Sequence, residues 1–335
     1  MTSETELLLH QPRSTSDADV ATTAPSAPTS TIANTFETGR VWTTTGPAVT
    51  TTTSHNASCL SWCNSDGVSQ KPPYFLSAVL LIRIYRPDPA GLTTREMLQW
   101  LAYLRYAGFE HVYVYDAFHE WSEAQKDALH MHIQAGFVSY FDWHEHANPY
   151  GIAKTQLSAY SHCLNNFGSH STWQSAIDID EYPFSPRDTN PGFLRRLLFK
   201  VGKEKPQWTE VTMQNFLWLG KPLSEVNHPL LMDRIYRRTK GKANGLVKPI
   251  YRPSALGDAG IHHNIIASGF STDIDPNILR LNHYWGGRLQ NWGNDTQKIL
   301  DMTIRDESIK PIVRRIMECQ RHCLPAKILT QKRWN

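Results

Sequence analysis

The segment SAIDIDEYPF, residues 175–184, places two aspartates two positions apart at the end of an apolar run and follows them with a glutamate. Residues two apart in an extended strand point to the same side, so we expect Asp178 and Asp180 to present their carboxylates in one direction. Two carboxylates at one edge, with positions open for phosphate oxygens, suit Mg²⁺ or Mn²⁺. The alternative is a chance Asp-x-Asp pair that marks a turn. We favour the metal interpretation because residues 173–179 read as the fourth strand of an alternating series.

Strand-like and helix-like segments alternate before this point. The helix that begins at Thr93-x-x-Glu96, a capping box, ends at Gly108. The expected order is strand 75–84, helix 93–108, strand 111–115, helix 122–136, strand 137–141, helix 152–166 with Leu157, Tyr160 and Leu164 inward, and strand 173–179. Such alternation favours βαβ units, in which ligands bind beyond the carboxyl ends of the strands.

The second part of the chain is richer in strands. Extended segments are expected at 211–217, 230–237, 247–251, 263–267 and 278–284, followed by helices near 294–304 and 308–322. We predict one α/β domain over residues 73–325, with a nucleotide-binding first half and a mixed, strand-rich acceptor half. Residues 1–72, rich in Thr, Ser and Pro, are expected to form a disordered tail, and 326–335 a short C-terminal tail.

Composition argues against two classes of protein. Lys plus Arg number 34 against 31 for Asp plus Glu, and this net charge of +3 does not favour a nucleic-acid binder. No run of apolar residues is long enough to span a membrane, and the first residues lack the basic and apolar regions of a secretory signal. Four of the five cysteines form two Cys-x-x-x-Cys spacings, which leave a zinc site or disulfides open.

The order of several short motifs resembles glycosyltransferase family 92 from about residue 75 to 290. The motifs are Tyr113-Val114-Tyr115-Asp116, Gln156-x-x-x-Tyr160-x-His162-Cys163-Leu164, Trp173, Asp178-Ile179-Asp180-Glu181-Tyr182, Phe216, Arg234, Lys248-x-x-x-x-Pro253, His263 and Asn282-His283-Tyr284-Trp285. The chain departs from the family pattern at Gln99-Trp100, where Glu-Trp is usual, and at Gly286-Gly287-Arg288.

The resemblance implies a GT-A-type fold, with a central mixed, mostly parallel sheet flanked by helices. It implies a UDP-sugar donor, usually UDP-galactose, a glycan or polysaccharide acceptor, Mn²⁺ or Mg²⁺, and inversion at the anomeric carbon. It also points to the Golgi or secretory pathway, where such enzymes usually carry a membrane anchor.

Site residues follow from the same resemblance. Asp178 and Asp180 would bind the metal and the diphosphate, and His283 would add a metal contact, although a half-buried histidine at a strand end is the alternative. The other expected donor contacts are Arg83, Tyr115 and Asp116 toward the uridine, and Lys248 or Arg234 as fixed cations. The alternative for the first three is an exposed polar residue at a strand end, and the alternative for the two cations is a solvated basic residue.

An inverting reaction also needs a base for the acceptor hydroxyl. The candidates are Glu181, Asp233 and Asp258, and we expect Glu181 to face away from the metal and orient its neighbours. Two other functions stay open: a catalytically silent carbohydrate-binding protein of the same fold, and a Mg-dependent phosphohydrolase of the haloacid type. The latter expects Asp-x-Asp on its first strand, whereas here it follows the fourth.

Overall fold

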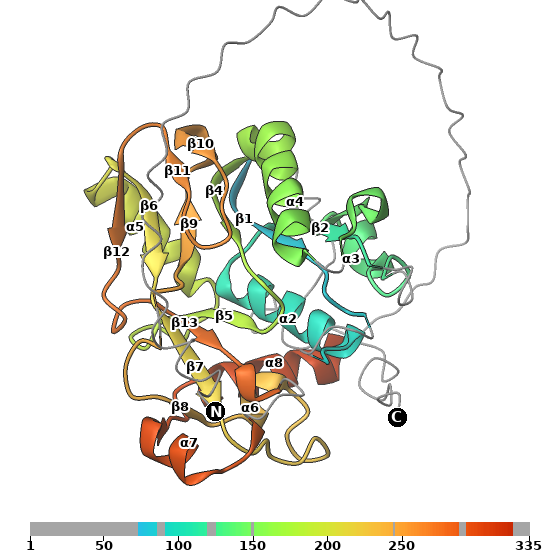
Figure 1. Cartoon of the computed structure of the whole chain (residues 1–335), viewed down its shortest axis with the longest axis vertical. Coiled ribbons are helices and arrows are strands. Elements are labelled where there is room, and N and C mark those ends of the chain that lie inside the picture. Colours follow the sequence, from blue (N-terminus) through green and yellow to red (C-terminus); the bar gives the residue numbers. More distant parts are fainter. Residues whose placement is uncertain are drawn as a thin grey trace, which may run out of the picture. The chain divides into compact units, whose positions relative to one another are not determined.

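The computed structural model describes residues 73–85, 91–118, 125–148, 151–243, 245–287 and 293–323 (Figure 1). All of them belong to one compact unit, residues 60–335. The tails expected over 1–72 and 326–335, and the helix start expected at Ser122, lie outside the described residues.

Among the described residues, seven strands form the central sheet, in the order β12-β6-β9-β4-β1-β2-β3. Their bounds are β1 Tyr74–Leu81, β2 His111–Asp116, β3 Val138–Asp142, β4 Ser171–Ala176, β6 Trp208–Met213, β9 Lys248–Tyr251 and β12 Phe270–Asp273. Strands β4, β1, β2 and β3 are parallel neighbours, β9 runs antiparallel between β4 and β6, and β12 is parallel to β6. The predicted α/β class with a mixed, mostly parallel central sheet is confirmed.

A second sheet has the order β14-β8-β7-β13-β5. Its strands are β5 Glu181–Phe184, β7 Asn215–Leu219, β8 Arg237–Thr239, β13 Arg280–His283 and β14 Thr303–Arg305, and a small pair joins β10 Leu256–Asp258 to β11 Ile265–Ile266. Residues 177–180 connect β4 to β5, and Gln214 alone separates β6 from β7. The chain therefore passes from the central sheet to the second sheet at two short connections.

The α-helices are α2 Thr94–Ala107, α3 His130–Gln134, α4 Ile152–Phe167, α5 Phe193–Glu204, α6 Leu231–Arg234, α7 Gln297–Met302 and α8 Lys310–Cys323. Short 3₁₀ helices are η2 His144–His146, η3 Gly168–His170, η4 Pro253–Ala255 and η5 Trp285–Gly287. In the described part of the chain, none of the helices has the length and apolar composition needed to cross a bilayer.

The sequence signals at both ends of α2 are confirmed. Thr93 and Glu96 form the reciprocal capping box, which satisfies backbone donors of the first turn. Gly108 ends the helix with φ 109°, and a Cβ placed there would lie 2.8 Å from the Cβ of Arg195. Only glycine adopts this backbone conformation without strain, so Gly108 also allows α5 to approach α2 closely.

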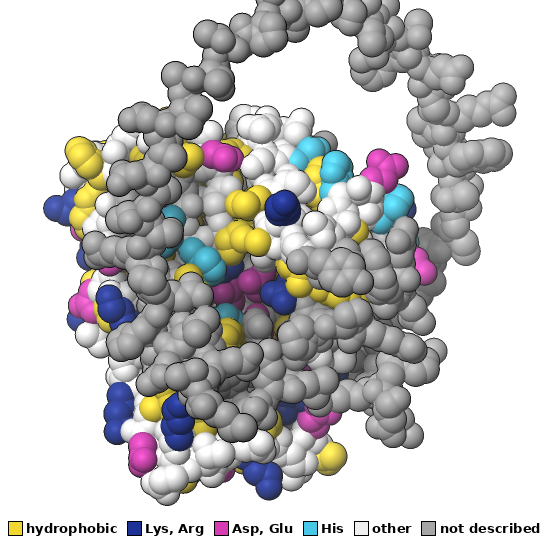
Figure 2. All heavy atoms as spheres, in the orientation of Figure 1, with side chains coloured by type: hydrophobic (Ala, Val, Ile, Leu, Met, Phe, Trp, Pro, Cys, Tyr) yellow, Lys and Arg dark blue, Asp and Glu magenta, His cyan; other side chains and the backbone are white. Residues whose placement is uncertain are grey.

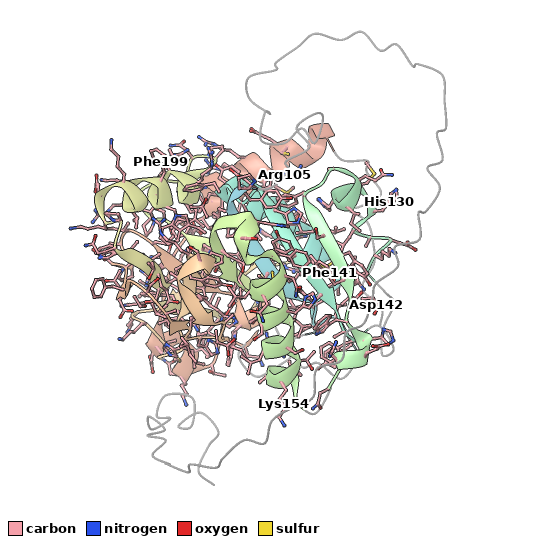
Figure 3. The ribbon with its side chains drawn as sticks, turned by 90° about the horizontal axis from the view of Figure 1, so that it is seen from above. Arg105, His130, Phe141, Asp142, Lys154 and Phe199 are labelled. Atoms are coloured by element: carbon pink, nitrogen blue, oxygen red, sulfur yellow. The ribbon has the colours of Figure 1, made fainter. Side chains whose placement is uncertain are left out.

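Alternate residues of β1 pack into two separate cores. Leu76, Ala78 and Leu80 belong to the core that contains the buried side chains of α2, α5 and α8, whereas Val79 and Leu81 share a core with α4. Both faces of the sheet are therefore covered by helices, and Figure 3 shows Arg105 of α2 and Lys154 of α4 on opposite sides of it. This burial on both faces explains why β1 reads as a continuous apolar run.

Several local predictions are wrong. Leu157 is 40% exposed because α4 buries the face that carries Ala159, Tyr160 and Cys163. The segment expected as one strand over 211–217 is divided between β6 and β7 at Gln214, and the one expected over 230–237 begins with the helical turn α6. A short apolar run such as Leu230–Met232 does not distinguish a strand from a buried helical turn by periodicity.

Candidate functional site

Strand β4 ends at Ala176, before the two aspartates. The Ile177 amide still donates to the Val79 carbonyl, but the Glu181 amide then donates to the Asp178 carbonyl at 3.0 Å and closes a turn. The expectation that Asp178 and Asp180 lie on one side of an extended strand is therefore wrong. The chain has to turn here because the next strand pairs with β13 in the second sheet.

The Asp178 side chain has partners from two other elements. Its Oδ1 accepts a hydrogen bond from Gln156 Nε2 of α4 at 3.0 Å, and its Oδ2 lies 3.3 Å from Lys248 Nζ of β9. In the sequence, only the family motif marks Gln156, and this contact with Asp178 depends on the fold. Asp178 is thus held at the carboxyl end of β4, the edge at which α/β sheets bind ligands.

Lys248 is a buried cation at the start of β9. Its side chain is 1% exposed, and its Nζ lies 3.1 Å from Glu181 Oε2 as well as 3.3 Å from Asp178 Oδ2. Burial alone would lower the pKa of Lys248, but the carboxylates of Asp178 and Glu181 outweigh burial and raise this pKa above its usual range. Lys248 is therefore a permanent positive charge between two carboxylates.

Asp180 pairs with the predicted histidine. His283 Nε2 lies 3.3 Å from Asp180 Oδ2, and the Tyr284 amide donates to the Asp180 carbonyl at 2.9 Å. His283 Nδ1 lies 3.5 Å from Asn215 Nδ2 at the start of β7. The two connections between the sheets thus supply neighbouring parts of one site.

Glu181 does not face away from its acidic neighbours. It is 2% exposed; its Oε2 accepts a hydrogen bond from the Asp178 amide at 2.9 Å, and its Oε1 lies 3.7 Å from His283 Nδ1. The register of the second sheet pairs Glu181 with His283 across β5 and β13. Burial raises the pKa of Glu181, with Lys248 opposing this rise and Asp178 adding to it.

We call Asp178, Asp180, Glu181, Lys248 and His283 the acidic centre. Its three carboxylates face one ammonium group, which leaves an excess of negative charge when the imidazole is neutral. Figure 2 shows acidic and histidine side chains gathered in a hollow near the middle of the visible face. Such a site attracts cations, and a bound cation would neutralise the excess charge.

The side chains of the acidic centre fit an open metal site. Among the described residues, no group of three or more His, Cys, Asp or Glu side chains is arranged to hold a metal ion. Mg²⁺ and similar ions, however, often take only one or two protein carboxylates and complete their shell with water and substrate phosphates. Asp180 and His283 offer an oxygen and a nitrogen ligand 3.3 Å apart, which suits Mn²⁺ when a diphosphate supplies further oxygens.

The residues expected to meet a uridine lie at the same edge of the sheet, with different surroundings. Tyr115 is fully buried, and its hydroxyl lies 2.9 Å from His162 Nδ1. One oxygen of Asp116, Oδ2, accepts hydrogen bonds from the Gln125 amide and the Tyr140 hydroxyl, both at 2.8 Å. Arg83 is half-buried just beyond β1. Tyr115 and Asp116 therefore have structural partners, and their contact with a nucleotide stays a prediction.

Two other predicted residues, Asp233 and Asp258, have hydrogen bonds away from the acidic centre. Asp233 Oδ2 lies 2.7 Å from His228 Nδ1, and the exposed Asp258 accepts hydrogen bonds from the Ser161 hydroxyl and the Ala259 amide. The buried Arg234 binds Glu96 Oε1 at 2.8 Å and also contacts Glu225. Arg234 thus stabilises the start of α2 rather than acting as a cation of the acidic centre.

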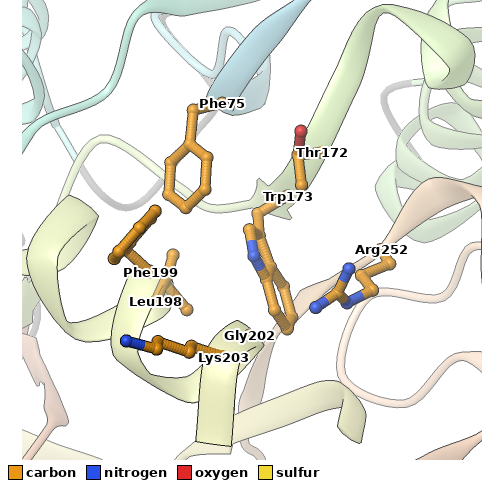
Figure 4. Close-up of a pocket in the computed structure, with 8 residues that line it drawn as sticks. All are labelled: Phe75, Thr172, Trp173, Leu198, Phe199, Gly202, Lys203 and Arg252. Carbon is orange, nitrogen blue, oxygen red and sulfur yellow. The ribbon is translucent and has the colours of Figure 1, made fainter. Parts of the chain in front are cut away.

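A cavity of about 290 Å³ lies at the opposite end of the sheet (Figure 4). Its lining comes from the starts of β1 and β4, from α5 and from the residue after β9: Phe75, Thr172, Trp173, Leu198, Phe199, Gly202, Lys203 and Arg252. The Arg252 guanidinium lies 4.5 Å from the centre of the Trp173 ring. Because the acidic centre follows the other end of β4, this cavity is not part of it.

Within the described residues, no group of side chains arranged to hold a metal ion includes a cysteine. Cys163 is a buried free thiol in the core beneath α4, and Cys319 of α8 is disulfide-bonded. Cys59 and Cys63 lie outside the described residues.

Three solved structures show a distant likeness to the chain. A putative glucose-1-phosphate thymidylyltransferase from Bacillus anthracis shares 11% identity over 54% of this chain and 72% of its own, with a TM-score of 0.31. A 4-diphosphocytidyl-2C-methyl-D-erythritol synthase from Anaerococcus prevotii shares 8% identity over 54% of this chain and 72% of its own, with a TM-score of 0.28. TarS from S. aureus shares 12% identity over 60% of this chain and 37% of its own, with a TM-score of 0.28. These scores are too low to support an argument.

A comparison with protein families gives a direct result, whereas no curated protein matches the chain. The family described as glycosyltransferase family 92 matches residues 93–318, about two thirds of the chain. The match covers α2 through most of α8 and includes the whole acidic centre. The chain belongs to glycosyltransferase family 92 and is a glycosyltransferase.

Proposed function

We propose that this enzyme transfers a hexose, galactose in the first instance, from a UDP-sugar to a glycan or polysaccharide acceptor with inversion at the anomeric carbon. Mn²⁺ or Mg²⁺ is the proposed cofactor. The observation that carries the proposal is the acidic centre at the carboxyl end of β4, where the Asp180–His283 pair and a buried lysine lie close to the same carboxylates. Family membership supplies the reaction class.

Asp180 and His283 are the proposed metal ligands. When bound, the cation would neutralise the charge that develops on the UDP leaving group. The Tyr284 amide fixes the backbone of Asp180, and Asn215 contacts the ring of His283, through the hydrogen bonds described above. This support matters because a metal ligand that is fixed before binding loses little freedom when the metal binds.

Asp178 has a different proposed role, because its Oδ2 is already paired with Lys248. We assign it to orienting the donor, with Gln156 and Lys248 fixing its carboxylate. Lys248 supplies a fixed positive charge beside the diphosphate, and a preorganised charge of this kind stabilises a leaving group without any rearrangement. Glu181 holds the Asp178 amide and Lys248, which is a supporting role.

The decisive experiment measures UDP release from a panel of UDP-sugars with and without Mn²⁺. Asp180→Ala and Asp178→Ala should each lower Mn²⁺-dependent release by about 100-fold or more, because each removes a group that stabilises developing charge. Asp127→Ala, a change at an exposed aspartate, is the matched control and should retain wild-type release. His283→Ala should require more Mn²⁺ for half-maximal activity.

Two outcomes would count against the proposal. If both Asp178→Ala and Asp180→Ala released UDP at the wild-type rate, neither aspartate would have the role assigned to it. Calorimetry that detects glycan binding but neither UDP-sugar nor Mn²⁺ binding would instead identify a silent carbohydrate-binding protein of the same fold.

A further inference from the structure

His262 lies in the loop between β10 and β11, and its ring has a defined tautomer. Its Nδ1 lies 3.1 Å from the Val247 carbonyl oxygen, directly before Lys248 in the chain. A carbonyl oxygen can only accept a hydrogen bond, so Nδ1 carries the proton. In the neutral ring, Nε2 therefore keeps its lone pair and is the basic atom.

The loop that carries His262 is fixed to the central sheet. The Gly260 amide donates to Asn264 Oδ1 at 2.8 Å, and Asn264 Nδ2 donates to Glu210 Oε2 of β6 at 2.6 Å. Ile261 packs against the core beneath α4. The imidazole is thus held at one nitrogen and cannot turn over without losing its hydrogen bond.

The charged groups around His262 come from the acidic centre. Lys248 of β9 and Asp178 after β4 interact with it electrostatically, together with His263 of its own loop. Burial and, to a smaller extent, Lys248 lower the pKa of His262 to about 4, while the hydrogen bond to Val247 and the Asp178 carboxylate partly oppose this. The side chain is half-buried and the ring is neutral at neutral pH, and no hydrogen bond joins its Nε2 to another of the described residues.

The carboxylates expected to serve as the base are already engaged. Glu181 is buried and bound to the Asp178 amide and Lys248. Asp233 is bound to His228, and Asp258 to Ser161. Of these candidates, none combines a basic atom without a partner with a position beside Lys248 and Asp178.

We propose that His262 is the general base of the transfer, an assignment that rests on the proposed function. Nε2 removes the proton of the acceptor hydroxyl while that oxygen forms its bond to the anomeric carbon. The bond from this carbon to the diphosphate oxygen breaks, and the departing oxygen keeps the electron pair. The imidazolium that forms is stabilised by Asp178, and it returns its proton to solvent once the products leave.

Basicity in the complex is sufficient for this step. A bound diphosphate brings further negative charge close to the ring, and nearby negative charge raises the pKa of an imidazole. Even before this increase, a pKa of about 4 is close to that of the Asp and Glu carboxylates, which also act as general bases in enzymes. The sequence contained this residue beside His263, and only the structure distinguishes them, because His263 is exposed.

The test compares His262→Asn with His263→Asn. The amide nitrogen of asparagine can keep the bond to the Val247 carbonyl but offers no base, so kcat for transfer should fall about 10²–10⁴-fold. Binding of UDP in the presence of Mn²⁺, measured by calorimetry, should stay within twofold of wild type, and His263→Asn should transfer normally. In His262→Ala, added imidazole should restore part of the transfer rate.

Each result has a clear meaning. Wild-type transfer by His262→Asn would overturn the assignment, as would a loss of UDP affinity equal to the loss of rate, which indicates a structural role. Absence of imidazole rescue in a folded, UDP-binding His262→Ala protein would also contradict it. If the wild-type protein transfers sugar from none of the UDP-sugars, the proposed function itself is wrong. An active wild-type protein with an equally active His262→Asn variant would instead contradict only the assignment of the base.

Discussion

Replacing Lys248 by methionine should destabilise the fold strongly. Lys248→Met keeps the apolar part of the side chain but removes the ammonium group that lies 3.1 Å from Glu181 and 3.3 Å from Asp178. Both lysine and Glu181 are almost fully buried, so solvent does not compensate for the lost charge. Removal of one partner of a buried ion pair costs about 3–5 kcal/mol of unfolding free energy.

The pH dependence of this loss has a predictable sign. The pKa of Lys248 is raised, so its contribution is fully present below its unfolded value of 10.5 and does not vary between pH 5 and pH 9. The pKa of Glu181 is also raised, so its ionisation opposes folding above the folded pKa and this penalty is lost on acidification. Without Lys248 to lower that pKa, the deficit of Lys248→Met should shrink as the pH falls from 7 to 5.

Thermal unfolding measures the effect. A change of 3–5 kcal/mol should lower Tm by roughly 6–20 °C in a domain of this size. Lys200→Met, at an exposed lysine of α5, is the control and should change Tm by no more than about 2 °C. The double variant Lys248→Met/Glu181→Gln should recover much of the loss. Equal Tm values for Lys248→Met and the control, or a deficit that grows on acidification, would refute the charge-pair reasoning.

Three further predictions concern the rest of the fold. Burial would raise the pKa of Glu96, but its hydrogen bond to Thr93 and its pairing with Arg234 lower this pKa from 4.5 to about 2. Glu96 thus contributes about 3 kcal/mol of stability above pH 4.5, and this contribution is lost between pH 4.5 and 2. Urea titrations of Glu96→Gln should not show this acid-dependent loss. Gly108→Ala should lower the unfolding free energy by about 1–3 kcal/mol because of its positive φ and the close Arg195 side chain, whereas Gly241→Ala, which meets no atom within 4 Å, should not; equal effects of the two would contradict this. Burial raises the pKa of the Cys163 thiol, so mass spectrometry should find it unmodified by iodoacetamide in the folded protein and modified after unfolding; rapid native labelling would show that the core beneath α4 opens.

Local signals in the sequence predict the alternation of strands and helices in the first half of the fold. Thr93, Glu96 and Gly108 predict the two ends of α2 because capping depends on residues close in sequence. The position of Asp178 at the carboxyl end of the fourth strand also follows from alternation alone. These features need no knowledge of distant partners.

The shape of the site depends on contacts that sequence periodicity does not contain. Strand β5 leaves the central sheet to pair with β13, about a hundred residues later, and this pairing turns the chain at Asp178 and brings Glu181 into the acidic centre. Lys248 lies at the acidic centre because β9 runs antiparallel beside β4, which places the start of β9 next to the end of β4. The roles of Tyr115 and Asp116 were likewise hidden, because their hydrogen-bond partners lie on α4 and β3 and in the segment before α3.

The two short connections between the sheets have a consequence for how donor binding should spread through the molecule. Asp178 and Asp180 lie on the connection from β4 to β5, and Asn215 begins β7 directly after Gln214, beside His283. A diphosphate and its cation that bridge these residues would couple the two sheets and restrict their relative movement. We therefore expect UDP and Mn²⁺ to slow amide hydrogen exchange in β5 and β13, which pair with each other in the second sheet. Binding at the acidic centre would then be measurable as a loss of local opening in the second sheet.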